Sequence, residues 1–138
     1  AAALRELDVA ELAVYGRNAE RGQAFAAALG CRFRGPLDAL EPASGEPRLI
    51  VNATSLGMVP EVEASPAAQG CFDAHTIAYD LVYTPAATRF LAEAEARGAH
   101  LVSGVDHFVA QAHAQLRAWL GERAGRLEAS WLRARLLG

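Results

Sequence analysis

The sequence predicts an α/β domain with a mostly parallel sheet, and three observations support this fold class. Apolar runs of strand length occur at residues 48–53 (RLIVNA) and 76–82 (TIAYDLV). Segments with helical periodicity alternate with the strands, the longest at residues 105–120. Glycines follow these helical segments, as helix ends commonly require. Strands that alternate with helices build parallel sheets with helices on their faces.

The first third of the chain contains short elements. Residues 1–8 are expected to form the last turns of a helix, because they are rich in Ala and Leu. A short strand at residues 11–16 precedes a helix at 19–29, which Asn18 caps at its start and Gly30 ends. The remaining elements of this region are a strand at 31–34, a helical turn at 36–40 and a loop at 41–47.

The rest of the chain continues the alternation around the two apolar strands. A loop over residues 54–64 leads to a short helix that Ser65-Pro66 would cap, and Thr84-Pro85 is a strong start for a helix at 86–97. The last elements are a short strand at 100–102, the helix at 105–120 that Gly121 ends, and a terminal helix over roughly 122–136. We find no repeat, and we expect one domain over residues 1–138.

Composition excludes several classes of protein. The chain of 138 residues is 52% hydrophobic, which is too apolar for a disordered segment. No apolar run is long enough to cross a membrane, and the first residues do not read as a signal peptide. A net charge of −3 without a basic stripe gives no reason to expect nucleic acid or an anionic membrane as a partner. The two cysteines, which lie far apart in sequence and are expected to be free thiols, make a cytoplasmic, reducing compartment the default expectation.

Residues that bind metals or act as nucleophiles are scarce. Cys31 and Cys71 match no metal spacing and are expected to be buried thiols, with a disulfide as the minority alternative. His107 and His113 have no carboxylate or cysteine at ligand spacing, so no metal is predicted. All 13 basic residues are arginine, so the sequence contains no lysine. A mechanism that needs a lysine acid, base or Schiff base therefore cannot run on this chain alone.

Two arginines follow the first predicted strand. In a doubly wound dinucleotide-binding fold, an acidic residue at the end of the second strand holds the 2′-hydroxyl of NAD, whereas an arginine accommodates the 2′-phosphate of NADP. This chain has Arg17 at that point and Arg21 one helical turn later, beside the helix start at Asn18. The spacing alone favours solvated arginines and a simple helix cap.

Small and polar side chains follow the two apolar strands. Asn52, Ala53, Thr54 and Ser55 come after the first, where small residues let the backbone approach a ligand, although a glycine-containing turn is the commoner explanation. Asp80 lies inside the second apolar run, which is costly unless the carboxylate is hydrogen-bonded. It indicates a site or a structural bond to nearby backbone. Tyr83 and Gln111 follow; taken alone, they are typical of a partly buried aromatic residue and a surface glutamine.

Taken together and in this order, the motifs resemble the shikimate dehydrogenase family. That family has an Asn-Arg-Thr/Ser signature after its second strand, then Asn-Ala-Thr-Ser-x-Gly-Met, and then Asp-x-x-Tyr-x-Pro-x-x-Thr. A Gly follows, with Gln seven residues later in a helix that ends near Trp-x-Gly. The match covers residues 11–121 approximately, and 122–138 would be a terminal helix. The matching residues are Gly16 to Asn18, Asn52 to Met58, Asp80 to Thr88, Gly104, Gln111 and Trp119 to Gly121.

The chain departs from the family pattern at three positions. Gly16 stands where the family usually has Asn, and Asn18 stands where it has Thr or Ser. His107 stands where the family usually has a Met near the nicotinamide.

The resemblance also implies a first strand, a Gly-rich phosphate turn and a lysine-bearing amino-terminal domain upstream of residue 1. We therefore expect a Rossmann-like NADP-binding half that lacks these parts, belongs to a longer protein and is inactive alone.

The resemblance implies a function and a set of site residues. The parent enzyme would reduce 3-dehydroshikimate to shikimate reversibly with NADPH, in aromatic amino acid biosynthesis through chorismate. It would bind this small-molecule substrate, and the family also allows a homodimer. No catalytic residue is expected in this chain, and Tyr83 and Gln111 would contact substrate. The implied cofactor-binding residues are Arg17, Asn18, Arg21, Asn52, Ala53, Thr54, Ser55, Leu81 and Gly104.

Two alternatives remain at this point. One is a quinate/shikimate dehydrogenase that prefers NAD, although Arg17 replaces the acidic residue that such an enzyme would carry. The other is a nucleotide-binding module without catalysis, which would not need the substrate-side polar residues Tyr83 and Gln111.

Overall fold

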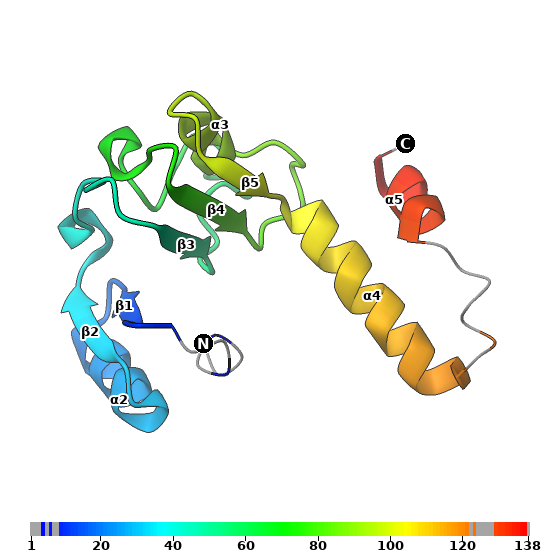
Figure 1. Cartoon of the computed structure of the whole chain (residues 1–138), viewed down its shortest axis with the longest axis horizontal. Helices are drawn as coiled ribbons and strands as arrows, with labels where there is room; N and C mark the ends of the chain where they lie inside the picture. Colours follow the sequence, from blue (N-terminus) through cyan, green and yellow to red (C-terminus); the bar gives the residue numbers. More distant parts are fainter. Residues whose placement is uncertain (1–3, 5, 7–8, 122, 124–128, 138) are drawn as a thin grey trace. The chain divides into compact units, whose positions relative to one another are not determined.

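The structure, a computed structural model, describes residues 4, 6, 9–121, 123 and 129–137 (Figure 1). Most of the helix expected at residues 1–8 therefore lies outside the described residues. The chain divides into two compact units, residues 1–42 and residues 43–138, and each is described by itself. In both units all strand pairs are parallel, as the sequence predicts.

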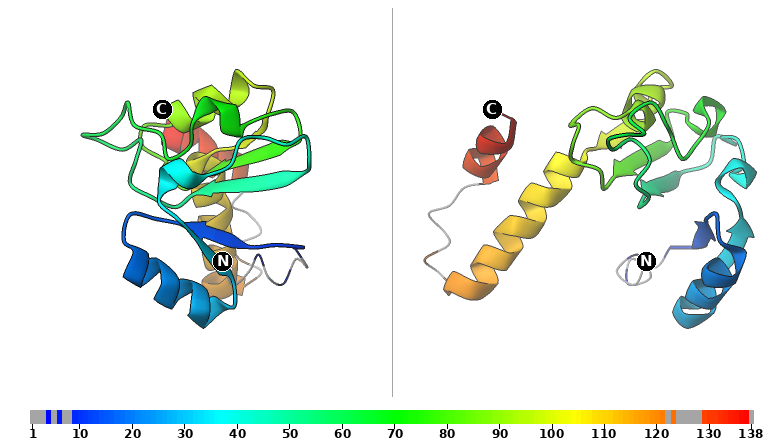
Figure 2. Two further views of the ribbon diagram at one scale, coloured as in Figure 1. Left: turned by 90° about the vertical axis from the view of Figure 1, so that its left-hand side faces the viewer. Right: turned by 180° about the vertical axis from the view of Figure 1, so that it is seen from behind.

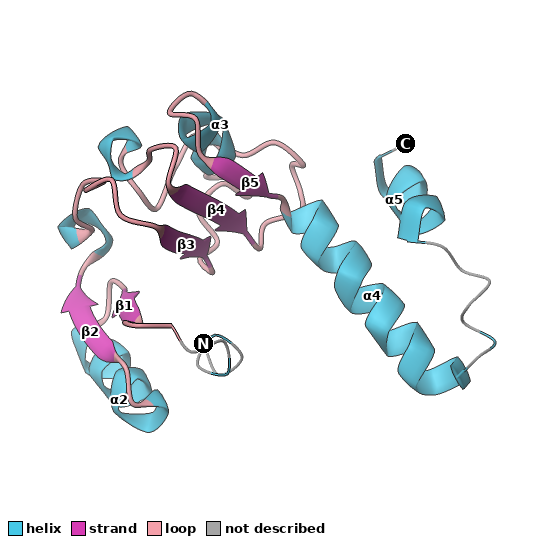
Figure 3. Ribbon diagram, in the orientation of Figure 1, coloured by secondary structure: helices cyan, strands magenta, loops and turns pink. Residues whose placement is uncertain are grey.

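Unit 1 is a strand–helix–strand arrangement (Figure 3). Strand β1 (Ala13–Tyr15) pairs in parallel with β2 (Arg32–Gly35), and helix α2 (Ala19–Leu29) connects them. A single 3-10 turn, η1 (Leu37–Ala39), follows where a helical turn was expected. The helix predicted at 19–29 is confirmed with the same ends, and both predicted strands are confirmed with ends that differ by one or two residues.

The ends of α2 follow from two side-chain and backbone features. The Oδ1 atom of Asn18 accepts a hydrogen bond of 2.8 Å from the backbone N–H of Arg21, which satisfies one donor of the first turn. Gly30 adopts the left-handed conformation with φ of 61°, and its N–H donates to carbonyls of the last turn. An L-residue with a side chain rarely adopts that φ, so glycine ends the helix here.

Unit 2 is built on a three-stranded sheet. The strand order is β3 (Arg48–Asn52), β4 (Thr76–Asp80) and β5 (His100–Val102), with Asn52 in register with Asp80. Helix α3 (Arg89–Glu95) packs against β4 and β5, and lies along one side of the sheet (Figure 2). The other helices are the 3-10 turn η2 (Gln69–Cys71), the long α4 (Gly104–Leu120) and α5 (Ala129–Leu137).

The core of unit 2 lies between its sheet and the adjoining helix and loops. The rings of Phe72 and Phe90 are fully buried and meet edge to face, with centroids 5.4 Å apart. The other buried apolar residues of this unit are Ala67, Cys71, Ala78, Val82, Leu91, Ala94, Val105 and Val109. Cys71 is a buried free thiol, as expected. Cys31 was also expected to be buried, but it is a half-buried free thiol in unit 1, which buries few apolar side chains.

Two predicted helix starts are wrong. Ser65-Pro66 begins no helix; the Ser65 hydroxyl donates to the carbonyl of Ala67, and the helical turn comes later as η2. Helix α3 begins after Thr88 and not at Thr84-Pro85. The Thr88 hydroxyl accepts from the backbone N–H of Leu91 and is itself held by a buried carboxylate, so a tertiary contact selects the cap. Of the terminal helix expected at 122–136, residues 122 and 124–128 lie outside the described part.

Candidate functional site

The predicted site residues lie at the carboxyl ends of parallel strands. In open α/β sheets, ligands bind outside these ends. In unit 1, β1 is followed by Arg17, Asn18 and Arg21. In unit 2, the predicted residues lie at the end of β3, in the turn after it, in the segment after β4 and on α4, where Gly104 is the first residue and Gln111 is near the middle.

The two arginines after β1 are free of ion pairs within the described part of unit 1. Arg17 and Arg21 are both exposed, and no carboxylate of the described residues lies within ion-pair distance of either guanidinium. Asn18 between them is occupied as the cap of α2. The first turn of this 11-residue helix also presents backbone N–H groups, which favour an anion. These arginines can therefore bind an anionic ligand without first breaking a salt bridge.

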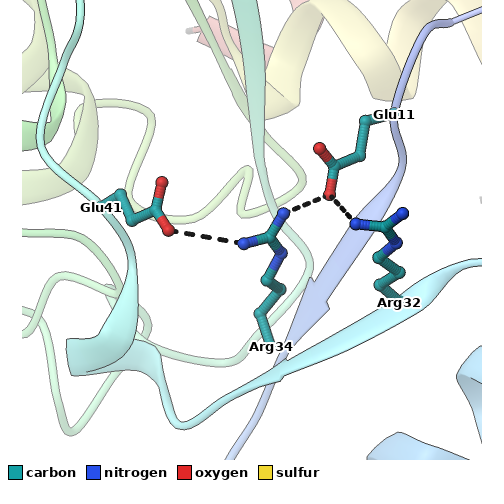
Figure 4. Close-up of polar contacts among 4 residues, drawn as sticks. All are labelled: Glu11, Arg32, Arg34 and Glu41. Atoms are coloured by element: carbon teal, nitrogen blue, oxygen red, sulfur yellow. Dashed lines mark hydrogen bonds and ion pairs between the residues drawn. The ribbon is translucent and has the colours of Figure 1, made fainter.

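A second arginine pair in unit 1 is already committed to carboxylates (Figure 4). On β2, the guanidinium of Arg34 lies 2.5 Å from a carboxylate oxygen of Glu11 and 3.4 Å from one of Glu41. Arg32 lies 3.8 Å from the same Glu11 oxygen. The hydrogen bond from Arg34, and then its charge, lowers the pKa of Glu11 below its ordinary value. The arginines of this cluster are paired with carboxylates, so they do not offer free charge to a ligand.

The turn after β3 is organised by Asn52. This side chain is buried, and its Oδ1 atom accepts from the backbone N–H and the hydroxyl of Thr54 at 3.0 and 2.8 Å. Its Nδ2 atom donates to the carbonyl of Leu56 and to a carboxylate oxygen of Asp80, at 3.1 and 3.0 Å. The Asn52 amide is thus used inside the protein, and the turn exposes its neighbours Ala53 and Ser55.

Asp80, at the end of β4, is fully buried. Its Oδ1 atom accepts from Asn52 and from the backbone N–H of Val82 at 2.9 Å, and its Oδ2 atom accepts from the Thr88 hydroxyl at 2.5 Å. The sequence indicated a site or a structural bond to nearby backbone, and the bond from Val82 confirms the second possibility.

The segment after β4 and the start of α4 meet at Gly104. A Cβ atom at this position would lie 2.0 Å from the carbonyl oxygen of Val82 and 2.7 Å from the backbone nitrogen of Tyr83. Only glycine allows the helix to begin this close to the strand end. Leu81, also in this segment, is half-buried, and its N–H donates to the carbonyl of Asn52 at 3.1 Å.

The two residues expected to contact substrate are both accessible. Tyr83 is 50% exposed, and its ring packs on Phe108 of α4 with centroids 5.2 Å apart. Its hydroxyl makes no hydrogen bond with another described residue, so it can bond a ligand or water. Gln111 is exposed one turn beyond Phe108 on the same helix.

One polar pair was missed by sequence reasoning. The hydroxyl of Tyr79 on β4 lies 2.6 Å from Nδ1 of His107 in the first turns of α4, and the two rings are 5.6 Å apart. The residues are 28 positions apart, so only the contact between the strand and the helix could reveal this pair.

No group of three or more His, Cys, Asp or Glu residues within the described ranges could hold a metal. Likewise, no described helix is long and apolar enough to cross a membrane.

Comparison with known proteins places these motifs in a family. No protein-family model matches the chain. The shikimate dehydrogenase (NADP(+)) of Symbiobacterium thermophilum is 37% identical over 125 residues, which cover 83% of this chain and 42% of that protein. The chloroplastic bifunctional 3-dehydroquinate dehydratase/shikimate dehydrogenase of Arabidopsis thaliana is 37% identical over 114 residues, covering 81% of this chain and 19% of that protein.

A solved structure of the same name superimposes on this fold. Shikimate 5-dehydrogenase from Thermus thermophilus, in complex with NADP(H) and shikimate, matches with a TM-score of 0.79 and 34% identity. The match covers 97% of this chain and 48% of that chain. This chain belongs to the shikimate dehydrogenase family.

Within the shikimate dehydrogenase family, the chain spans less than half the length of the relatives described above. The expected Rossmann-like fold class is confirmed. Two of the departures from the family motifs have a local explanation. Asn18 accepts the capping bond that a Thr or Ser hydroxyl accepts at a helix start, and Gly16 lies in open space that a side chain would not need to fill.

Proposed function

We infer that the chain is the NADP-binding part of an NADP-dependent shikimate dehydrogenase, which interconverts 3-dehydroshikimate and shikimate. The observation that carries this inference is the exposed Arg17 after β1, free of ion pairs within the described residues, at the position where NAD-binding folds keep an acidic residue. Its planar guanidinium matches phosphate oxygens and cannot lose its charge near neutral pH. The names of the relatives support the same activity.

Each unit, taken by itself, carries residues that suit a part of this cofactor. In unit 1, Arg17 and Arg21 would bind the 2′-phosphate, and Asn18 would hold the helix start beside it. In unit 2, Thr54 and Ser55 would contact the cofactor from the turn after β3. Gly104 has no Cβ to obstruct close approach to the backbone after β4. NADPH, when bound, supplies the hydride, and the protein supplies orientation.

The substrate would be bound from unit 2. Tyr83 offers a hydroxyl that makes no hydrogen bond with another described residue, and Gln111 offers an exposed amide on α4. Both groups can donate to the hydroxyl and carboxylate oxygens of shikimate, and both can accept from its hydroxyl groups. Because the sequence has no lysine, we expect residues 1–138 alone to bind ligands without turning them over. Absorbance of NADPH, followed with shikimate and NADP⁺, measures this.

The test of cofactor choice is a binding titration. Calorimetry of the chain with NADP⁺ and with NAD⁺ should show preference for NADP⁺. Replacing Arg17 by Ala should weaken NADP⁺ binding by about 1.5–3 kcal/mol, the usual worth of a hydrogen bond to a charged group, and leave NAD⁺ almost unaffected. Arg32→Ala, which removes an exposed arginine from β2 of the same unit, should weaken neither. Equal affinity of the wild-type chain for both dinucleotides would reject the assignment and favour the NAD-using alternative.

A further inference from the structure

Asp80 lies at the centre of a buried set of hydrogen bonds that no ligand-binding role yet accounts for. It has no exposed surface, and none of the described arginines or histidines forms an ion pair with it. Three donors approach its two oxygens, at 3.0, 2.9 and 2.5 Å. A buried carboxylate of this kind is tolerated only when such bonds replace its hydration.

Each donor comes from a different piece of the chain. Asn52 ends β3 and shapes the turn with Thr54, Val82 belongs to the segment that leads to Tyr83, and Thr88 caps α3. Asp80 therefore connects the turn after β3, the segment after β4 and the start of α3 through one carboxylate.

The side chains of this set hydrogen-bond to one another and to nearby backbone, so none of them can rotate without breaking a hydrogen bond. The amide of Asn52 makes four hydrogen bonds. The single hydroxyl hydrogen of Thr88 is given to Asp80, while its oxygen accepts from Leu91. Packing adds to this, because a Cβ at Gly57 would lie only 3.3 Å from the Thr88 side chain. The turn after β3 thus rests against the cap of α3.

We propose that Asn52, Asp80 and Thr88 form a clamp that positions the two ligand-binding segments, residues 53–57 and 81–83, relative to each other. Asp80 and Thr88 are positioning residues in this role: they act through Thr54 and Tyr83 and touch no ligand. This inference rests on the proposed function for its consequence in binding. The clamp itself is a property of the protein without ligand.

The experiment compares two substitutions of Thr88 in the 138-residue chain. Thr88→Val keeps the shape that packs on Gly57 but removes the hydroxyl, whereas Thr88→Ser keeps the hydroxyl. Phe72→Leu is the matched control, because it weakens the core without touching the clamp. Hydrogen exchange of the Thr54 amide reports the far side of the clamp without ligand, and calorimetry with NADP⁺ and shikimate reports binding.

Thr88→Val removes the bond to Asp80 and the cap bond from Leu91. It should speed exchange at Thr54 about tenfold and weaken ligand binding about five- to tenfold, as expected for the loss of these hydrogen bonds. Thr88→Ser should stay within about twofold of wild type, and Phe72→Leu should lower the melting temperature without changing binding. Unchanged exchange at Thr54 in Thr88→Val would overturn the clamp, and so would an equal loss of binding in Phe72→Leu. A wild-type chain that binds neither ligand would instead reject the proposed function, while the exchange result still decides the clamp.

Discussion

The two units bury apolar side chains to very different extents, although both are built from parallel strands and helices. Among the described residues, Ala26 is the one apolar residue of unit 1 that is buried, whereas unit 2 buries the Phe72–Phe90 pair and a polar set around Asp80. The salt bridges of unit 1 are exposed to solvent, and such bridges contribute little to stability. A segment of about 40 residues rarely builds a sufficient core of its own.

This difference matches what each unit offers a ligand. Unit 1 presents charge: Arg17 and Arg21 are exposed beside a helix start and need little fixed geometry to attract a phosphate. Unit 2 presents groups in fixed orientations, because the half-buried Thr54 and the exposed Tyr83 lie next to buried hydrogen bonds. We therefore expect substitutions of buried residues in unit 2 to lower stability, and substitutions of Arg17 or Arg21 in unit 1 to weaken ligand binding by removing charge.

The largest effect should come from a pair of Phe→Ala substitutions, one in each unit. Phe90 is fully buried, so Phe90→Ala should reduce the free energy of unfolding by about 3–5 kcal/mol. Phe25 on α2 is 49% exposed, so Phe25→Ala should change it by no more than about 0.5 kcal/mol. Urea denaturation followed by circular dichroism measures both. If both variants lost a similar free energy of unfolding, the stability of unit 1 would depend on its core as strongly as that of unit 2 does.

A pair of glycines provides the next test. Gly104→Ala places a methyl group against backbone atoms of Val82 and Tyr83, which cannot move as a flexible side chain can. The substitution should cost about 1–3 kcal/mol of stability, in the range of overpacking. Gly16→Ala meets nothing within 4 Å and should be neutral. A neutral Gly104→Ala, measured by thermal unfolding, would mean that α4 is free to shift away from the end of β4.

Sequence reasoning succeeded where the determining interactions are local. The cap at Asn18 and the stop at Gly30 depend on neighbours within one helical turn, and both are confirmed. It failed for the start of α3, because Thr88 is selected by Asp80 eight residues away and by the packing of the sheet. The predictions of a buried Cys71 and of the two apolar strands held because they depend on apolar character, whereas Cys31, also expected to be buried, is only half-buried.

The candidate site divides in the same way. Its motifs were visible in the sequence, and family membership is confirmed, yet the contact between Tyr79 and His107 was not visible. That contact joins residues 28 positions apart on different elements. A single sequence carries no periodic signal for such a pair. The ligand contacts of individual site residues stay predictions that binding experiments must decide.

Gln111 allows a smaller and more specific test. Because it is exposed on α4 of unit 2, Gln111→Ala should leave stability and NADP⁺ affinity unchanged. It should weaken shikimate binding by about 0.5–1.5 kcal/mol, the worth of one neutral hydrogen bond. Gln115→Ala, one turn further along the same helix, is the matched control and should have no effect. If shikimate binding, measured by calorimetry with NADP⁺ present, is the same in all three proteins, Gln111 is a surface residue only.

The smallest effect concerns the exposed charge cluster of unit 1. Arg34 lowers the pKa of Glu11, first by its hydrogen bond and then by its charge. A carboxylate with a lowered pKa in the folded state stabilises it above the ordinary glutamate pKa, about 4.3, and this contribution is lost as pH falls through the folded-state pKa. Hydrogen exchange of amides in the β1–β2 pair, measured relative to the intrinsic exchange rate, should therefore accelerate as the pH falls. The acceleration should be larger in the wild-type chain than in Glu11→Gln. Salt should shrink the difference, because both partners are solvent-exposed. Identical pH dependence in the two proteins would show that the ion pair contributes nothing to the pairing of β1 with β2.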